Sequence, residues 1–188
     1  YGQWLLDPVD FVIAASGGDM TGARLSENLQ YGDVKIRITD NDDPGNGDIL
    51  VNDDISWVTN STLELYSLRD IFVNSKIMSY GDNAGLNLSA IRDIIISDDI
   101  IFSGDKSLIT IDSGYHYNTI PILGRFGIYG GSISITGENS ELTIDDEKFV
   151  IVKTAQDLMD IKFEDRGFYA LGRDIDFSSE SLSGTTHP

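Results

Sequence analysis

Short runs of aliphatic residues, separated by Asn, Asp, Gly and Ser, recur along the chain at a nearly constant spacing. Three of these runs align, with starts 22 and 23 residues apart: Asp48–Ile55, Asp70–Ile77 and Asp93–Ile100. A second run follows each at the same step, over residues 62–65, 85–88 and 107–111. Weaker runs flank them at 33–38, 131–135 and 142–144. Short alternating runs bounded by turn residues predict strands rather than helices.

A repeat of this length, with two or three short strands in each copy, predicts a parallel β-helix. Each coil stacks on the previous one at a distance of about 4.8 Å, and inward Ile, Leu and Val form continuous rows. A single coil cannot bury its apolar face alone, so several are needed. We therefore expect an all-β solenoid over residues 1–150, with a loop at 112–130 that breaks the period.

Stacked coils also predict columns of polar side chains at the turns. Asn52, Asn74 and Ser97 are expected to share one turn position and to hydrogen-bond along the stack. Asp54, Lys76 and Asp99 are expected to share another, where alternating charges relieve repulsion between coils.

A third column is acidic and contains Asp48, Asp70 and Asp93, with Arg69 and Arg92 beside the last two. One interpretation is a solvated turn edge with local Arg–Asp pairing. The other is a column of aspartates that binds a cation.

One helix start is visible near the C-terminal end of the chain. Thr154 can cap a helix, and Asp157 follows three residues later, where a carboxylate meets exposed backbone amides. Leu158 and Ile161 are then expected to be buried. Residues 151–188 are predicted to form this short helix and a strand near 167–171, as a terminal cap or the start of a next module.

Composition excludes several classes of function. The chain has 188 residues, 31 acidic and 13 basic, and a net charge of -18, which repels phosphate backbones, so we expect no nucleic acid partner. It has no cysteine, which excludes disulfides, thiolate metal sites and cysteine nucleophiles. No apolar run approaches the roughly 20 residues of a membrane span, so no membrane insertion is expected.

The N-terminal segment Trp4–Ala14 reads Trp-Leu-Leu-Asp-Pro-Val-Asp-Phe-Val-Ile-Ala, and a Gly-Gly-Asp stretch (17–19) and an amphipathic piece (23–29) follow it. This order resembles the filamentous-haemagglutinin-like adhesins, the large exoproteins of bacterial two-partner secretion. The Asp48–Ile55 unit, Arg69-Asp70-Ile71, and the tail segments 154–159 and 169–176 also resemble that family. The resemblance touches both ends and the middle of the chain.

This resemblance implies a right-handed parallel β-helix that is exported through the outer membrane and used for attachment. The implied location is secreted or on the bacterial cell surface, and the implied partners are a host glycan or protein receptor and, for the parent protein, an outer-membrane transporter. The secretion domain of the family, with its Asn-Pro motifs, is absent, so the chain is expected to be an internal segment. Neither a cofactor nor a metal is expected.

The loop at 112–130 holds three of the eight tyrosines and one of the two histidines. Insertions in solenoids are pushed outward, and exposed Tyr and Arg anchor recognition surfaces. The predicted ligand-binding residues are Tyr115, His116, Tyr117, Arg125 and Tyr129. The alternative is an extended coil whose aromatic residues cover an exposed strand edge.

Catalytic and metal motifs are weak. The acidic turn at 40–48 could supply oxygens to Ca²⁺, but Pro44 replaces a ligand of the EF-hand pattern, so a plain turn is the other interpretation. The acidic pairs at 98–99 and 145–147 have no motif that places them in a cleft. His116 and His187 have no partner motif.

We therefore expect a non-enzymatic protein. The alternative is a β-helical polysaccharide lyase that uses Arg125 and the aspartate column, in which the strong negative charge would repel an anionic polysaccharide.

Overall fold

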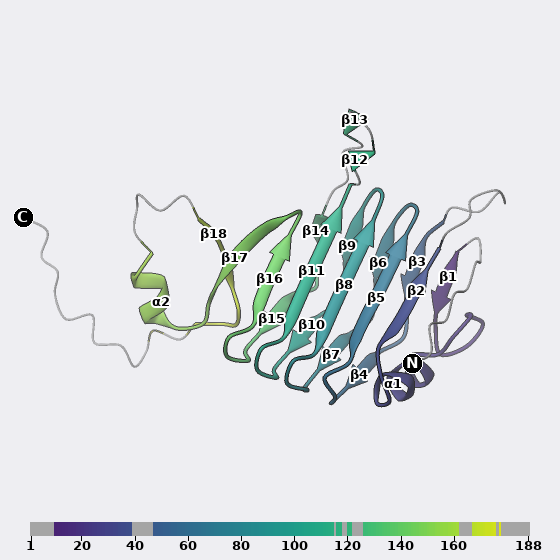
Figure 1. Cartoon of the computed structure of the whole chain (residues 1–188), viewed down its shortest axis with the longest axis horizontal. Helices are drawn as coiled ribbons and strands as arrows, with labels where there is room; N and C mark the ends of the chain where they lie inside the picture. The colour runs from purple at the N-terminus through teal and green to yellow at the C-terminus, as the bar shows by residue number, and fades with distance from the viewer. Residues whose placement is uncertain are drawn as a thin grey trace, which may run out of the picture.

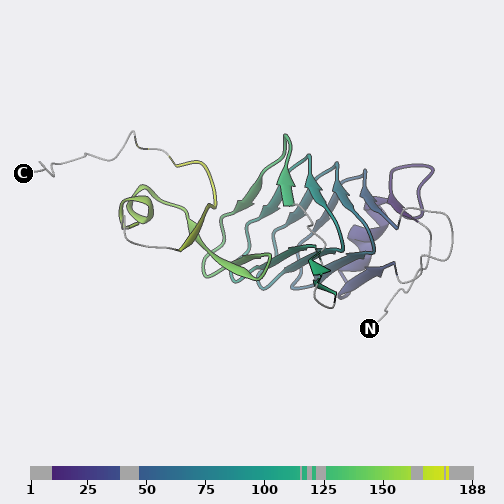
Figure 2. The same cartoon turned by 90° about the horizontal axis from the view of Figure 1, so that it is seen from above.

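The structure is a computed structural model that describes residues 10–38, 47–114, 116–117, 120–121, 126–161, 167–175 and 177, with only the backbone for 116, 117, 120 and 121. Strands are the main regular structure of the described chain, and they form three largely parallel sheets side by side along the molecule (Figures 1 and 2). The predicted all-β class and the parallel pairing are confirmed. No helix among these residues is long and apolar enough to cross a membrane.

Each sheet collects strands that are far apart in the sequence. The first sheet contains β1 (Phe11–Ile13), β3 (Ile49–Val51), β6 (Ile71–Val73), β9 (Ile94–Ile96) and β14 (Phe126–Ile128). The second contains β4 (Ile55–Trp57), β7 (Ile77–Ser79), β10 (Ile100–Phe102) and β15 (Ile133–Ile135). The third contains β2 (Val34–Arg37), β5 (Thr62–Ser67), β8 (Gly85–Ala90), β11 (Leu108–Ser113), β16 (Glu141–Ile144), β17 (Glu147–Val152) and β18 (Phe168–Leu171).

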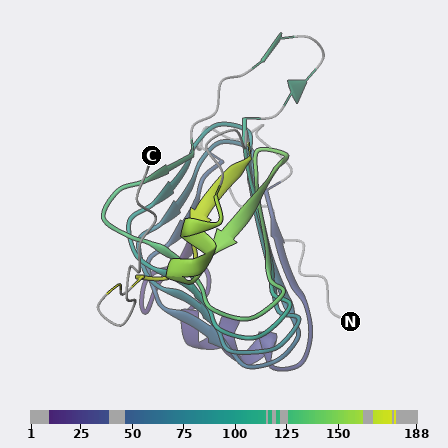
Figure 3. The same ribbon diagram turned by 90° about the vertical axis from the view of Figure 1, so that its left-hand side faces the viewer.

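The chain visits the three sheets in turn, and one such circuit contributes one strand to each. Viewed along the molecule, the circuits superpose around a common centre (Figure 3). Ile49 pairs with Ile71, and Ile71 pairs with Ile94. The sequence separations of these pairs, 22 and 23 residues, equal the separations between the starts of the aligned runs. The repeat read from the sequence is therefore the strand register, and each aligned run contains two strands with a turn between them.

The interior is filled by the first and third residues of the short strands β1, β3, β4, β6, β7, β9 and β10. In the first sheet, Ile49, Ile71 and Ile94 are fully buried in one row. The middle residues of these strands are also apolar but point outward and are half-buried. In the second sheet Ser79 lies between Trp57 and Phe102, and its small side chain lets the two rings meet edge-to-face, with centroids 5.6 Å apart.

At the N-terminal end, helix α1 (Gly22–Leu29) takes the place of a second-sheet strand and packs beside β4. Thr21 caps the helix by accepting the N–H of Arg24, and Leu25 and Leu29 are fully buried. The sequence analysis described this segment only as amphipathic and did not predict a helix. The capping Thr21 and the Leu25/Leu29 spacing were the available signals.

At the C-terminal end, the parallel order of the third sheet stops at β16. Ile144 pairs with Glu147, so β16 and β17 form an antiparallel hairpin with a two-residue turn. Both turn residues have positive φ, 49° at Asp145 and 65° at Asp146, as a type I′ hairpin turn requires. Parallel stacking of successive circuits in the third sheet therefore ends at residue 144, although β17 and β18 beyond it pair parallel to each other.

The predicted period break lies between β11 and β14. In its place β12 (His116–Tyr117) and β13 (Ile120–Pro121) pair antiparallel and project from the body (Figure 1). Phe126 pairs with Ile94, so the next circuit resumes in register after this longer excursion of the chain.

Helix α2 (Ala155–Met159) begins where the sequence predicted. The predicted capping box is confirmed: Thr154 Oγ1 accepts the N–H of Asp157 at 3.0 Å, and Asp157 accepts the N–H of Thr154 at 3.0 Å. The predicted burial is wrong, because Leu158 is 38% exposed and Ile161 is only half-buried. The helix has five residues and lies outside the stack, so the side chains of Leu158 and Ile161 have no core to pack into.

Candidate functional site

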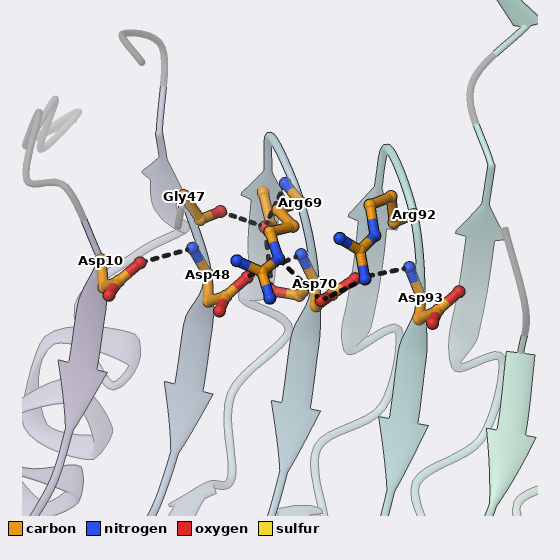
Figure 4. Close-up of polar contacts among 8 residues, drawn as sticks. Asp10, Gly47, Asp48, Arg69, Asp70, Arg92 and Asp93 are labelled. Carbon is orange, nitrogen blue, oxygen red and sulfur yellow. Dashed lines mark hydrogen bonds and ion pairs between the residues drawn. The ribbon is translucent and has the colours of Figure 1, made fainter. Parts of the chain in front are cut away.

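Four aspartates lie in one row where the third sheet turns into the first, and the first three each accept a backbone N–H from the next circuit (Figure 4). Asp10 Oδ1 accepts the N–H of Asp48 at 2.9 Å. Asp48 Oδ1 accepts the N–H of Asp70 at 3.1 Å, and Asp70 Oδ1 accepts that of Asp93 at 3.0 Å. We call this row the aspartate ladder. Sequence analysis found three of its members and missed Asp10, whose spacing to Asp48 departs from the period.

Two arginines lie over the aspartate ladder and pair with it. Arg69 Nε is 3.5 Å from Asp48 Oδ1 and 3.2 Å from Asp70 Oδ2, and an Arg92 Nη is 3.3 Å from Asp70 Oδ2. The predicted Arg–Asp pairing is confirmed. The description of this edge as solvated is wrong for Asp48 and Asp70, which are 7% and 3% exposed, whereas Asp10 and Asp93 at the ends of the row are half-buried. The carboxylates of Asp48 and Asp70 are buried under the turn, and the guanidinium groups of Arg69 and Arg92 lie over them, nearer the surface.

The carboxylates of the ladder act as hydrogen-bond acceptors and ion-pair partners within the fold. Burial raises the pKa of Asp48 above its usual range, and Arg69 opposes that shift. The Asp70 oxygens are already engaged, one by the N–H of Asp93 and one by the two guanidinium groups. Among the residues that the structure describes, no group of three or more His, Asp or Glu could hold a metal ion. The interpretation as a cation column therefore has no support in the described part of the chain.

Of the other two predicted columns, the first is present at its Asn52–Asn74 step, and the second is present at both of its steps. Asn74 Nδ2 donates to Asn52 Oδ1 at 2.9 Å. Asp54 accepts the backbone N–H of Lys76 at 3.0 Å, and the Lys76 ammonium is 3.5 Å from Asp99. A hydrogen bond from the Ser132 hydroxyl, together with Lys76, holds the pKa of Asp99 below its usual range.

A further acidic row at the corner before the third sheet was missed. Asp82 accepts the N–H of Asp105 at 2.9 Å, and Asp105 accepts that of Glu138 at 2.8 Å. The repeated Gly-acid pairs at 81, 104 and 137 were the sequence signal for it. Many of the acidic residues therefore satisfy backbone N–H groups between circuits, which gives the negative charge a structural cause.

An acidic cleft of about 340 Å³ lies at the ends of β8, β11 and β16, beside the projecting hairpin. Asp112, Asp145 and Asp146 line it. Burial raises the pKa of Asp112, and the two neighbouring carboxylates raise it further. The sequence did not place Asp145 and Asp146 in a cleft, and the hairpin turn explains why they are there. Asp145 already accepts the N–H of Ser113 at 2.7 Å, so its carboxylate links the hairpin turn to the end of β11.

The predicted ligand-binding residues are only partly described. Tyr115 and Arg125 lie outside the described residues, and His116 and Tyr117 are described only as backbone of β12. Tyr129 is 68% exposed, and its ring lies against Gly127 on the outer face of the first sheet. The structure therefore does not test whether the five side chains meet. Residues 40–46 of the proposed calcium turn and His187 also lie outside the described residues.

Comparison of the chain with protein-family models, with curated proteins and with solved structures gives no match.

Proposed function

We propose that the chain is a non-enzymatic segment of a large bacterial adhesin, secreted or exposed on the cell surface, in which it acts as a rigid stalk. We further propose that its circuits form a right-handed parallel β-helix. The observation that carries the proposal is the in-register parallel pairing of successive circuits in three sheets, joined at the corners by carboxylate–amide bonds. The resemblance of its motifs to filamentous-haemagglutinin-like adhesins supports the same function.

Stiffness follows from the direction of these bonds. Backbone hydrogen bonds between parallel strands run along the stacking axis, and so do the bonds of the aspartate ladder. Bending the stack would stretch them on one side in every circuit at once, which is why stacked-repeat proteins resist deformation. A stalk needs this property and does not need a catalytic cleft.

The proposed receptor contact is the segment 112–130, which carries the projecting hairpin and, just after β14, Tyr129. Its partner is a host cell-surface glycan or protein. An outer-membrane transporter is the proposed partner of the parent protein. The exposed ring of Tyr129 and a hairpin that stands away from the body are suited to recognition, because both are accessible to a large ligand.

A binding experiment tests the receptor contact. Wild-type chain, Tyr129→Ala and the matched control Tyr80→Ala are applied to a glycan array and to host cells. Tyr80 is 53% exposed and lies just after β7, away from the loop. We expect at least about a tenfold loss of affinity in Tyr129→Ala alone. Equal binding by all three variants would exclude Tyr129 from the contact.

The stalk is tested separately by pulling single molecules from both ends. We expect the molecule to lengthen in steps that correspond to the unfolding of one circuit, because each circuit is bonded only to its neighbours. Collapse of the whole chain in one step at low force would contradict a stalk. Release of unsaturated product from pectin or alginate would contradict a non-enzymatic role.

A further inference from the structure

The last circuit of the stack differs from the earlier ones in how its inward side chains are covered. Its strands β14, β15 and β16 pair in register with β9, β10 and β11 of the preceding circuit. The inward residues of that preceding circuit are all fully buried: Ile94, Ile96, Ile100, Phe102, Ile109 and Ile111. Among their partners in the last circuit, Ile135 and Leu142 are buried, whereas Ile128 is 46% exposed. The apolar interior of the stack is therefore incompletely covered at this end.

The incomplete cover leaves an apolar pocket of about 190 Å³. Inward side chains of β14, β15 and β16 form its walls. Its roof contains Ile151 of β17 together with Ala170 and Leu171 of β18, and these two strands, light green and yellow, cross this end of the stack (Figure 3). Voids larger than a water molecule are few in protein interiors, so a pocket of this size is a distinct feature of the chain.

Backbone contacts hold the roof in place. Gly172 O accepts the N–H of Ile135 at 2.7 Å, and the Gly172 N–H donates to Val152 O at 2.8 Å, so the chain just after β18 is bonded to β15 and β17. A Cβ at Gly172 would lie 2.6 Å from Ile135 O, so the two segments already approach as closely as a glycine permits. The pocket therefore cannot close by an inward movement of the roof at this point.

The lining selects the chemistry of an occupant. The described residues that line the pocket carry no polar side chain, and a water molecule in a cavity needs two to four polar partners. A charged group would lose its hydration there without a counter-ion, and the hydroxyl groups of a sugar would lose theirs without new hydrogen bonds. The pocket therefore favours an uncharged hydrocarbon group.

The volume sets the size of that group. Apolar cavities of about 150 Å³ that are lined by Leu, Ile and Phe accept benzene, so this pocket fits a single ring with a small substituent or a branched chain of roughly six to eight carbons. Access is also provided, because the pocket is open to solvent and two residues that line it, Ile128 and Leu171, are 46% and 59% exposed.

We propose that this pocket is a binding site for one small uncharged ligand, an aromatic ring or a branched hydrocarbon, held between the last circuit and β18. The ligand takes the place that the inward side chains of a further circuit would fill, and removal of its apolar surface from water drives the binding. This inference is independent of the proposed adhesin function, because it depends only on the pocket.

The experiment follows the isoleucine methyl signals of the full chain by NMR while toluene is added. We expect the signals of Ile135, Ile144 and Ile151 to shift, with a dissociation constant of about 1 mM or tighter. The signals of Ile49 and Ile71, which lie in earlier circuits, are expected to stay unchanged. Benzylammonium is the matched probe, because it has the same ring and is attracted by the net charge of -18, yet its ammonium group opposes entry into an apolar pocket.

Two variants with matched controls locate the site. Ala170→Leu fills the pocket, and Ala23→Leu adds the same atoms at an exposed position of α1. Leu171→Asp places a charge beside the pocket, and Leu108→Asp does so at a leucine that is 48% exposed on β11. We expect both pocket variants to weaken toluene binding about tenfold or more, and both controls to keep the wild-type affinity.

Each outcome decides the proposal. Pocket signals that do not move up to saturation with toluene would overturn it, and so would equal affinities in the pocket variants and their controls. Benzylammonium that binds as tightly as toluene, with the same shifts, would contradict an apolar site. Shifts of the same signals caused by protein concentration alone would assign the pocket to a second copy and reject a small ligand. Leu171→Asp changes an exposed side chain, so it decides the question if Ala170→Leu does not fold.

Discussion

Asp70 Oδ1 accepts the backbone N–H of Asp93 at 3.0 Å, and these two residues occupy the same position in successive circuits. The carboxylate of one circuit thus completes the backbone of the next. Asp70 is only 3% exposed, so bulk water has little access to take over this role. The acidic residues of this chain are therefore part of its framework as well as of its surface.

Replacing Asp70 tests the aspartate ladder. Asp70→Ala leaves the Asp93 N–H without this acceptor and removes the carboxylate that faces Arg69 and Arg92. We expect a loss of about 3 kcal/mol in the free energy of unfolding. Urea titration monitored by circular dichroism measures it. Asp54→Ala is the control at an exposed corner and is expected to cost only about 1 kcal/mol. Equal losses would mean that burial does not strengthen the ladder.

Gly104 tests the spacing between circuits. Gly81, Gly104 and Gly137 form a column in which a Cβ at each would overlap the backbone carbonyl of the previous circuit. Gly104→Ala must push two circuits apart, and we expect it to destabilise the fold by more than about 2 kcal/mol. Thermal unfolding gives the comparison with Ser103→Ala, an exposed neighbour that should change little. A small effect at Gly104 would show that the stack can expand locally.

Lys106 has a backbone conformation that costs free energy. Its φ is 55°, and the residues in the same turn of the adjacent circuits, Asn83 and Asn139, have φ of 58° and 55°. Asn tolerates this left-handed region better than Lys does. Lys106→Asn is expected to stabilise the chain by about 0.5 to 1 kcal/mol, and Asn83→Lys to destabilise it by a similar amount. Melting temperatures of the two variants that move in the same direction would contradict this explanation.

The raised pKa of Asp112 predicts that the stability of the fold depends on pH. Its folded-state pKa is raised, by burial first and then by Asp146 and Asp145, so the stability linked to its proton is present below the unfolded pKa. That stability is lost as pH rises through the folded pKa. Asp112→Asn is therefore expected to be more stable than wild type at neutral pH, and the difference should vanish under acidic conditions near pH 3.8 or lower. Urea titrations at several pH values measure it. A gain that persists at low pH would assign the effect to another cause.

The repeat could be predicted from the sequence because the spacing of the aligned runs is the same as the register between paired strands. Asp48, Asp70 and Asp93 recur at the period of the strands, and the same residues mark the corner of each circuit. Strand positions and turn columns followed from that single period, whereas the start of α2 followed from its own capping residues. Helix α1 was missed because it takes a strand's place in the circuit, and a repeat gives no information about the unit that departs from it.

The candidate sites were harder to predict. Burial of Asp70 cannot be read from a run of polar turn residues, because it depends on Arg69 and Arg92 folding over the corner. The cleft around Asp112 depends on the antiparallel reversal at Asp145 and Asp146, which an Asp-Asp pair signals only weakly. The roles of Tyr115 and Arg125 stay a prediction.

The aspartate ladder also has a direction. In every step the carboxylate belongs to the earlier circuit and the N–H to the later one, from Asp10 to Asp93. A chain that folds from its N-terminal end therefore adds each new circuit to an acceptor already in place. A chain that folds from the other end would add each new circuit to a backbone N–H already in place, so the direction of folding decides whether the side chain or the backbone is the waiting group.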